Sequence, residues 1–264
     1  MPIVTVNGIK LNYKVEGQGY PLVMVMGFSA NRSAWSPQTK FFKKHYKVVT
    51  FDNRGAGKSD KPEGPYSTRM MADDTVKLMD HLEMKKAHIL GASMGGMIAQ
   101  ELAINYPERV SKLVLACTFA CKDEVSGDTA EQAELLHLSP QKMAAGMVKL
   151  AVNKPFYQFV LGILAIIQAS FLGVSAKAGL KGQREACNSH NTLDRLPLIK
   201  APTLVIVGTK DRIINPVSSE VIARNIPGAI LIKVEGGSHM FCMEMRTSFN
   251  QKVFDFLKRE NYPS

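Results

Sequence analysis

A serine between glycines is the feature of this chain that most directly predicts chemistry. Residues 87–99 read Ala-His-Ile-Leu-Gly-Ala-Ser-Met-Gly-Gly-Met-Ile-Ala, an apolar run that meets Ser93 and then continues with helical spacing. Gly91 and Gly95 complete the pattern Gly-x-Ser-x-Gly, in which a strand turns sharply into a helix because the tight backbone has no room for side chains at these two positions. We expect Ser93 to be a nucleophile at this bend. The alternative is an ordinary helix N-cap.

A serine hydroxyl is a weak nucleophile, so this interpretation requires a histidine base and a carboxylate that orients the histidine. Two later segments can supply them. Residues 201–212 form an apolar run rich in β-branched residues that ends in a glycine turn carrying Asp211, and residues 230–240 end in a Gly-Gly turn that carries His239. The other histidines do not follow such a turn, so we expect His239 to be the base and Asp211 its partner.

The order Ser93, Asp211, His239 along the chain is the order of the α/β-hydrolases and not that of chymotrypsin or subtilisin. On these motifs, and on residues 51–59 (Phe-Asp-Asn-Arg-Gly-Ala-Gly-Lys-Ser), the chain resembles the α/β-hydrolase superfamily. The resemblance is to the branch of small esterases, enol-lactonases, C–C bond hydrolases and cofactor-free haloperoxidases. Some members place the acid after the sixth strand, where this chain has Asp123 and Glu124. These two residues are the alternative to Asp211.

The resemblance also implies two backbone N–H donors for a developing oxyanion. One is the amide of Met94, directly after the nucleophile, and the other is the amide of Phe28 in the segment Met26-Gly27-Phe28-Ser29. Family members commonly have His-Gly where this chain has Met26-Gly27, a change that removes a side chain and keeps the backbone donor. We expect Gly27 and Trp35 to contribute to substrate binding, although Trp35 is equally compatible with a place in the core.

The glycines of residues 52–59 suggest a phosphate loop, but the Gly-x-x-x-x-Gly-Lys-Ser/Thr spacing is missing. The resemblance implies a structural turn near the rim of the pocket instead.

The elements that must position these residues follow an α/β rhythm. Short buried strands alternate with helical segments, and the chain opens with two strands joined at Asn7-Gly8, a strong hairpin signal. The expected strands before the middle of the chain are 3–6, 9–15, 22–26, 47–51, 87–90 and 110–116; the expected helices are 68–84 and 94–106. This alternation predicts the α/β class, and the resemblance specifies the α/β-hydrolase fold: a mostly parallel, twisted, eight-stranded sheet with helices on both faces.

The alternation of strands and helices ends at about residue 119, and the next convincing strand begins at Thr203. Residues 129–138, 139–152 and 155–174 have helical patterns. We therefore expect a core of residues 1–118 and 198–264, with residues 119–197 inserted after the sixth strand as a helical cap over the carboxyl edge of the sheet, where ligands of such sheets bind. Helix 241–259 closes the core.

Residues 156–176 carry almost no charge and approach the length of about 20 residues that spans a bilayer. Gln158, Gln168 and Ser170 interrupt this segment, and a central span would split the core across a membrane. We expect cap helices here, with docking on a membrane or on lipid aggregates as the alternative.

Composition excludes several classes of protein. Of the 264 residues, 45% are apolar and 21% are charged, which is typical of a globular domain. The four cysteines, Cys117, Cys121, Cys187 and Cys242, are too scattered for a disulfide framework or a zinc site. The start of the chain has no signal-peptide pattern, so we expect a cytoplasmic protein. The net charge of +10 is dispersed in short pairs, which indicates a solvated surface and no nucleic-acid partner.

The sequence thus predicts a serine hydrolase that cleaves carboxylic esters or lactones of small to medium, largely apolar substrates through an acyl-enzyme. It needs no metal and no organic cofactor, and it acts as a monomer or homodimer on a small molecule. Three alternatives stay open. The same three residues could serve a C–C bond hydrolase or a cofactor-free perhydrolase (haloperoxidase), or the fold could be a non-catalytic ligand sensor.

Overall fold

The structure is a computed structural model that describes residues 2–122, 134–135, 138–170 and 173–259. Its strands form one eight-stranded sheet with the order β1-β2-β4-β3-β5-β6-β7-β8. The strands are β1 (Ile3–Val6), β2 (Ile9–Glu16), β3 (Pro21–Val25), β4 (Lys47–Phe51), β5 (Ala87–Ala92), β6 (Val110–Ala116), β7 (Thr203–Gly208) and β8 (Ile230–Val234). Strands β3 to β8 pair in parallel, and β2 is antiparallel to its neighbours β1 and β4. The predicted fold class is confirmed.

The hairpin that opens the chain forms where the sequence predicts it. Asn7 and Gly8 both have positive φ, 46° and 76°, and Val6 pairs with Ile9 across the turn. Two successive left-handed residues twist the chain in the sense that the flanking strands require. This turn chemistry explains why the first two strands pair with each other.

Two layers of helices cover the two faces of the sheet. Successive side chains of β3 alternate between two buried clusters. Val23 and Val25 belong to the cluster that includes residues of α2, α3 and α8, whereas Leu22 and Met24 belong to the cluster that includes residues of α1 and α10. The α-helices of these layers are α1 (Ser36–Phe42), α2 (Thr68–His81), α3 (Met94–Asn105), α8 (Pro216–Asn225) and α10 (Arg246–Leu257). Because both faces are buried, the central strands are mostly apolar.

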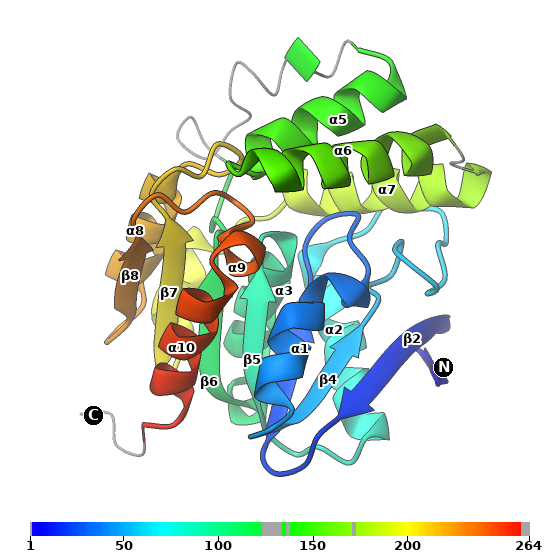
Figure 1. Ribbon diagram of the computed structural model, residues 1–264. Coiled ribbons are helices and arrows are strands. Elements are labelled where there is room, and N and C mark those ends of the chain that lie inside the picture. Colours follow the sequence, from blue (N-terminus) through cyan, green and yellow to red (C-terminus); the bar gives the residue numbers. More distant parts are fainter. Residues whose placement is uncertain (1, 123–133, 136–137, 171–172, 260–264) are drawn as a thin grey trace.

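Three further helices lie over one edge of the sheet. They are α5 (Pro140–Ala151), α6 (Pro155–Ser170) and α7 (Val174–Asn188), which follow β6 and precede β7 in the chain. Figure 1 shows them above the carboxyl ends of the parallel strands. The loops that follow β3, β5, β7 and β8 therefore meet beneath these helices, which is where the sequence places its candidate site residues.

The structure corrects several helix boundaries. The expected helix 155–174 ends at Ser170, and α7 is a separate helix that the sequence analysis did not predict. Gly173, with extended backbone angles of −74° and 170°, precedes α7 and was the signal for this break. The expected helix 241–259 is divided at Met245 into α9 (Phe241–Glu244) and α10. Most of the expected helix 129–138 lies outside the described residues.

None of the helices in the described ranges is long and apolar enough to cross a membrane. Helix α6, the most apolar candidate, has 16 residues. At about 1.5 Å per residue it measures roughly 24 Å, shorter than the roughly 30 Å of a bilayer core.

Candidate active site

Ser93 stands at a sharp bend between β5 and α3, and two glycines make the bend possible. A Cβ on Gly91 would lie 2.2 Å from the carbonyl oxygen of Gly95, and a Cβ on Gly95 would lie 2.1 Å from the carbonyl oxygen of Val25. Both distances are far below van der Waals contact, so β5, the start of α3 and β3 approach this closely only because residues 91 and 95 lack side chains. The Gly-x-Ser-x-Gly pattern thus predicts the local structure correctly.

The backbone of Ser93 is strained and firmly held. Its φ of 55° and ψ of −126° cost a non-glycine residue about 1–3 kcal/mol. The Ser93 N–H donates to the Ala116 carbonyl at 2.9 Å, and the Ser93 carbonyl accepts from Gly96 N–H at 2.8 Å and Thr118 Oγ1 at 2.9 Å. Ser93 Oγ itself forms no hydrogen bond with any residue that the structure describes. The hydroxyl is therefore available to a substrate.

The loop after β3 lies directly against this serine. A Cβ on Gly27 would be 3.0 Å from Ser93 Cβ and 3.5 Å from Ser93 Oγ. Within the described ranges, the backbone N–H groups of Phe28 and Met94 donate to no protein acceptor. Met94 also begins α3, where the helix dipole is positive. An oxyanion hole requires two such donors close to the serine hydroxyl, so Phe28 and Met94 stay the candidates for this role.

Two side chains that the sequence analysis did not single out support this loop. Asn53 Nδ2 donates to the Met26 carbonyl at 2.7 Å. Gln183 of α7 is fully buried, and its Oε1 accepts from Ser29 N–H at 2.8 Å while its Nε2 donates to the Arg54 carbonyl at 2.7 Å. Residues 52–59 accordingly form a turn that supports the loop after β3 through Asn53. Asn53 and Gln183 support a loop that lacks the histidine common in the family.

Asp211 and His239 form a hydrogen-bonded pair at the ends of β7 and β8. His239 Nδ1 lies 2.8 Å from Asp211 Oδ2, and Asp211 Oδ1 accepts from the N–H groups of Ile213 and Ile214, both at 2.9 Å. A carboxylate can only accept, so Nδ1 carries the proton and Nε2 is left as the basic nitrogen. The alternative acids Asp123 and Glu124 lie outside the described residues.

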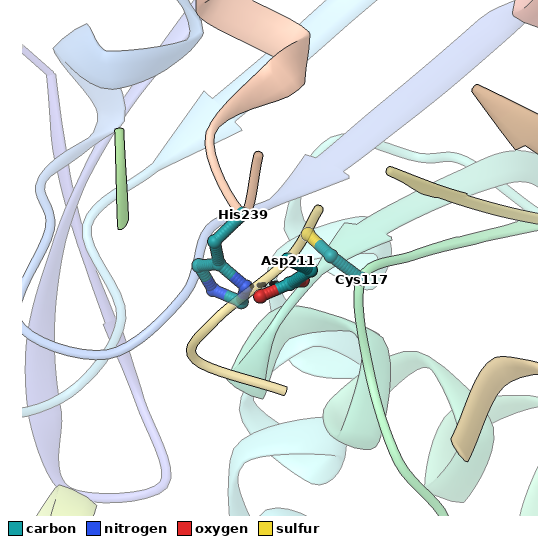
Figure 2. A group of neighbouring side chains, drawn as sticks. All are labelled: Cys117, Asp211 and His239. Carbon is teal, nitrogen blue, oxygen red and sulfur yellow. Dashed lines mark hydrogen bonds and ion pairs between the residues drawn. The ribbon is translucent and has the colours of Figure 1, made fainter. Parts of the chain in front are cut away.

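Cys117 is the third member of this group (Figure 2). Its Sγ lies within 4.8 Å of ligand atoms of Asp211 and His239, a grouping that can hold metal ions in other proteins. Burial raises the pKa of the Cys117 thiol well above its ordinary value, and the neighbouring Asp211 carboxylate adds to the rise. The thiol is therefore neutral, and Asp211 and His239 already bind each other. These donors fit an acid–base pair packed against a thiol better than a metal site, because His239 Nδ1 and Asp211 Oδ2 are already engaged with each other.

Trp35 is fully buried in the apolar cluster on the α1 and α10 face, with Met24 and Phe42. Its indole N–H has no hydrogen-bond partner among the described residues. The structure thus places Trp35 in the core, whereas Gly27 lies beside Ser93.

Glu244 connects the loop that carries His239 to the α5–α6 turn. Its buried carboxylate accepts from the backbone N–H of Lys154 at 2.6 Å and of Asn153 at 3.2 Å, just before α6 begins, and it also binds the hydroxyl of Ser238. The Met240 N–H donates to the Ala151 carbonyl at 3.0 Å. Both neighbours of His239 in the chain are therefore held in place. Ser238 binds Glu244, and Met240 binds the last residue of α5. No local sequence pattern marks Glu244, because its partners lie about 90 residues away.

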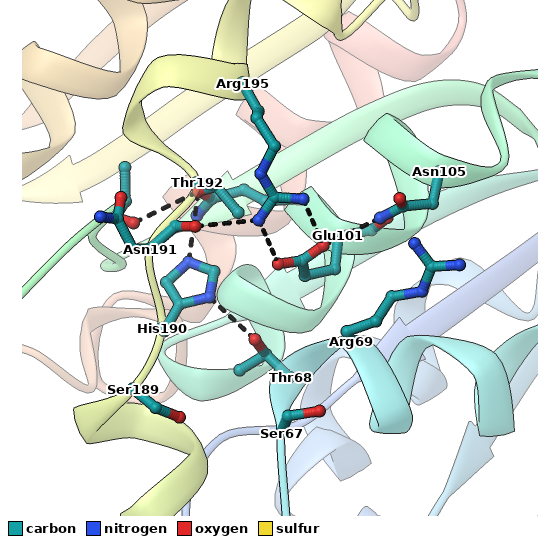
Figure 3. A network of polar contacts seen from close by, with 12 residues as sticks. Ser67, Thr68, Arg69, Glu101, Asn105, Ser189, His190, Asn191, Thr192 and Arg195 are labelled. Atoms are coloured by element: carbon teal, nitrogen blue, oxygen red, sulfur yellow. Dashed lines mark hydrogen bonds and ion pairs between the residues drawn. The ribbon is translucent and has the colours of Figure 1, made fainter.

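A buried polar network joins the two ends of the insertion to the core (Figure 3). Thr192 donates from its backbone N–H to the Ala120 carbonyl at 2.8 Å and from Oγ1 to Gln100 Oε1 at 2.6 Å. His190 contacts Thr68 Oγ1 through Nδ1 at 2.9 Å and Thr192 Oγ1 through Nε2 at 3.3 Å. These bonds fix the segments that enter and leave the insertion side by side on α2 and α3.

Comparisons with known proteins agree with this geometry. The profile of the alpha/beta hydrolase fold family matches residues 20–160. The 3-oxoadipate enol-lactonase 2 of Acinetobacter baylyi is 29% identical over 98% of this chain and 97% of its own length. The enol-lactonase structure from Burkholderia xenovorans LB400 has 28% identity and a TM-score of 0.85, and covers 98% of this chain and 100% of that one. The structure of Est816, described as an N-acyl homoserine lactone degrading enzyme, has 30% identity and a TM-score of 0.86. The match covers 97% of this chain and 100% of the Est816 chain.

The fold, the serine bend and these similarities define the class of the protein. The chain belongs to the α/β-hydrolase family. The resemblance inferred from the sequence motifs is thereby confirmed, including the similarity to enol-lactonases.

The buried histidines predict how stability depends on pH. Burial lowers the pKa of His190 and of His88 from 6.5 to about 4. As the pH falls below 6.5, the unfolded chain binds protons that the folded protein excludes, so the free energy of unfolding decreases. Between pH 7 and pH 5 we expect a loss of about 2 kcal/mol per histidine. Urea unfolding of His190→Gln should show a smaller loss than the parent protein. An unchanged pH dependence would contradict the assignment of His190.

Removing the negative charge of Glu244 should loosen the His239 loop and the α5–α6 turn together. In Glu244→Gln an amide NH2 faces donors where a carboxylate oxygen accepted, at a cost of about 1–3 kcal/mol. For a chain of this size, we expect the melting temperature to fall by roughly 5 °C in calorimetry. Glu235→Gln, an exposed change in the same loop, is the matched control. Equal melting temperatures of the two variants would contradict the role of Glu244.

Proposed function

We propose that this protein is a serine hydrolase that opens lactones and cleaves small carboxylic esters through an acyl-enzyme. Ser93 is the nucleophile, His239 the general base and acid, and Asp211 the residue that orients His239. The amides of Phe28 and Met94 stabilise the oxyanion, and Gly27 allows the carbonyl group of the substrate to approach Ser93. The reaction requires no metal or organic cofactor.

The reaction has two halves. His239 Nε2 takes the proton of Ser93 Oγ as this oxygen attacks the carbonyl carbon, and the negative charge on the carbonyl oxygen falls between the two N–H donors. The tetrahedral intermediate then expels the alkoxide, which His239 protonates. With a lactone, this alkoxide remains attached to the acyl chain as its terminal hydroxyl. A water molecule activated by His239 then hydrolyses the acyl-enzyme.

The observation that carries this proposal is the pairing of His239 Nδ1 with Asp211 Oδ2 at 2.8 Å. It fixes the tautomer of the neutral imidazole in which Nε2 is the basic nitrogen, as a general base needs. The unbonded Ser93 hydroxyl is compatible with this role, because catalytic hydrogen bonds often form only with the substrate in place. Cys117 helps to keep this pair in a water-poor environment.

The substrate class rests on the relatives. Two of the similar proteins reported above are enol-lactonases, and Est816 degrades N-acyl homoserine lactones. We further propose that residues 119–197 act as a cap domain on a core of residues 1–118 and 198–264.

Replacing the nucleophile tests the proposal directly. In Ser93→Ala, hydrolysis of p-nitrophenyl butyrate and of an acyl lactone should fall by about 10⁵-fold or more, because the acyl-enzyme cannot form. Ser175→Ala, an exposed serine of α7, is the matched control and should retain full activity. Full ester turnover by Ser93→Ala would overturn the proposal.

The same assay separates the alternative functions. A parent enzyme that ignores esters and lactones but cleaves a vinylogous diketone would be a C–C bond hydrolase. One that forms peracid from acetate and hydrogen peroxide much faster than it hydrolyses esters would be a perhydrolase. Negligible turnover with a large ligand-induced rise in melting temperature would indicate a sensor. Each of these outcomes would contradict the proposed function.

Asp211→Asn should abolish most activity without unfolding the protein. The N–H groups of Ile213 and Ile214 would hold the amide oxygen in the place of Oδ1, so the NH2 group would face His239 and select the wrong tautomer. We expect kcat to fall by about 10⁴-fold, as in serine proteases with the equivalent change. Steady-state kinetics and the melting temperature measure the two effects. Asp255→Asn, on the exposed side of α10, is the control, and parental kcat in Asp211→Asn would show that another residue is the acid.

A further inference from the structure

Helix α6 presents an apolar stripe to solvent. Phe156 and Phe159 are 71% and 69% exposed, and Val160, Ile163 and Leu164 are also exposed. Their spacing of i, i+3, i+4, i+7 and i+8 places all five on one face of the helix. Of the ten large apolar side chains that are exposed in the described ranges, these make up half. Five exposed apolar side chains on one helix that has no charged residue indicate a docking surface, because isolated exposed apolar residues would be scattered over the molecule.

The three helices α5 to α7 together are strongly basic. Residues 140–188, which span α5 to α7, contain six basic residues and one acidic residue, a net charge of +5 within a chain of net charge +10. The basic residues are all exposed: Lys142, Lys149, Lys154, Lys177, Lys181 and Arg184. None of them forms an ion pair within the part of the chain that the structure describes. Lys154 Nζ donates to the Glu244 carbonyl at 2.9 Å. An exposed apolar stripe within a strongly basic group of helices matches an anionic lipid surface.

Charge also discriminates between the possible occupants of the stripe. Two copies of this chain joined through α6 would bring two such basic helix sets together, which electrostatic repulsion opposes. The acidic residues Asp123, Glu124, Asp128, Glu131 and Glu134 precede the three helices in the sequence. An anionic membrane instead attracts the lysines and offers an apolar phase to the phenylalanines.

We propose that the α6 stripe docks this enzyme onto anionic lipid bilayers, with the stripe in the interface and the lysines and arginine of α5 to α7 at the headgroups. Docking is peripheral, since no described helix spans a bilayer. It would hold the carboxyl edge of the sheet close to a phase in which apolar esters and lactones concentrate. This inference concerns a surface of the insertion and goes beyond the proposed function, because binding to lipid requires no turnover.

Flotation with unilamellar vesicles tests the proposal on the full chain. Vesicles of phosphatidylcholine mixed with phosphatidylglycerol should bind the protein, and binding should weaken as salt is added; pure phosphatidylcholine should bind little. The variant Phe156→Ser/Phe159→Ser should reduce binding by at least roughly tenfold. The variant Lys177→Gln/Lys181→Gln should reduce it by roughly 30-fold. Ile3→Ser/Leu198→Ser is the control, with both residues 56% exposed and outside α5 to α7.

Two further measurements separate the possible results. Hydrolysis of soluble p-nitrophenyl butyrate should be the same in all these variants, which shows that they fold, and Ser93→Ala should bind vesicles like the parent protein. Equal binding to neutral and anionic vesicles, or undiminished binding of the Phe156→Ser/Phe159→Ser variant, would overturn the proposal. So would a homodimer, detected by light scattering, that this variant dissociates, because a second copy would then cover the stripe.

Discussion

The candidate site depends on the close approach of three backbone segments around Ser93. The end of β5, the first turn of α3 and the end of β3 come so near to one another that Gly91 and Gly95 have no space for a Cβ. This contact forces Ser93 into a left-handed conformation, and hydrogen bonds to Ala116, Gly96 and Thr118 hold it there. The same contact brings Gly27 and the unused N–H groups of Phe28 and Met94 to the serine. The same packing constraint therefore positions both the proposed nucleophile and the proposed oxyanion donors.

The inserted helices also help to position the site. Gln183 of α7 binds the Ser29 amide in the loop after β3, and Glu244 binds the turn before α6 while it contacts Ser238, the neighbour of His239. The helices therefore support the loop after β3 and the loop that carries His239 through separate side chains. A movement of the insertion would be transmitted to both sides. The network around His190 and Thr192 restrains such movement at the base of the insertion.

Sequence predicted the elements whose cause is local. The hairpin at Asn7-Gly8, the buried strands and the serine bend follow from backbone rules, and the chain order of Ser93, Asp211 and His239 indicated the α/β-hydrolase fold. The contributions of Asn53, Gln183 and Glu244 could not be predicted, because each side chain binds backbone groups that are distant in the sequence. Only the folded structure shows that these three polar side chains are buried against those groups. Helix α7 was missed because its polar sequence follows an apolar run and the break at Gly173 is a single residue. The basic surface of α5 to α7 was likewise hidden in charges that look dispersed along the chain.

In the proposed mechanism Ser93 and His239 act together, and the imidazole of His239 activates the hydroxyl of Ser93. Labelling with a fluorophosphonate, followed by peptide mass mapping, measures this most directly, because the reagent reacts only with an activated serine. We predict one phosphonylated residue, Ser93, in the parent protein and a loss of labelling in His239→Ala. A label on any other residue, or labelling of Ser93 at an undiminished rate in His239→Ala, would contradict the account.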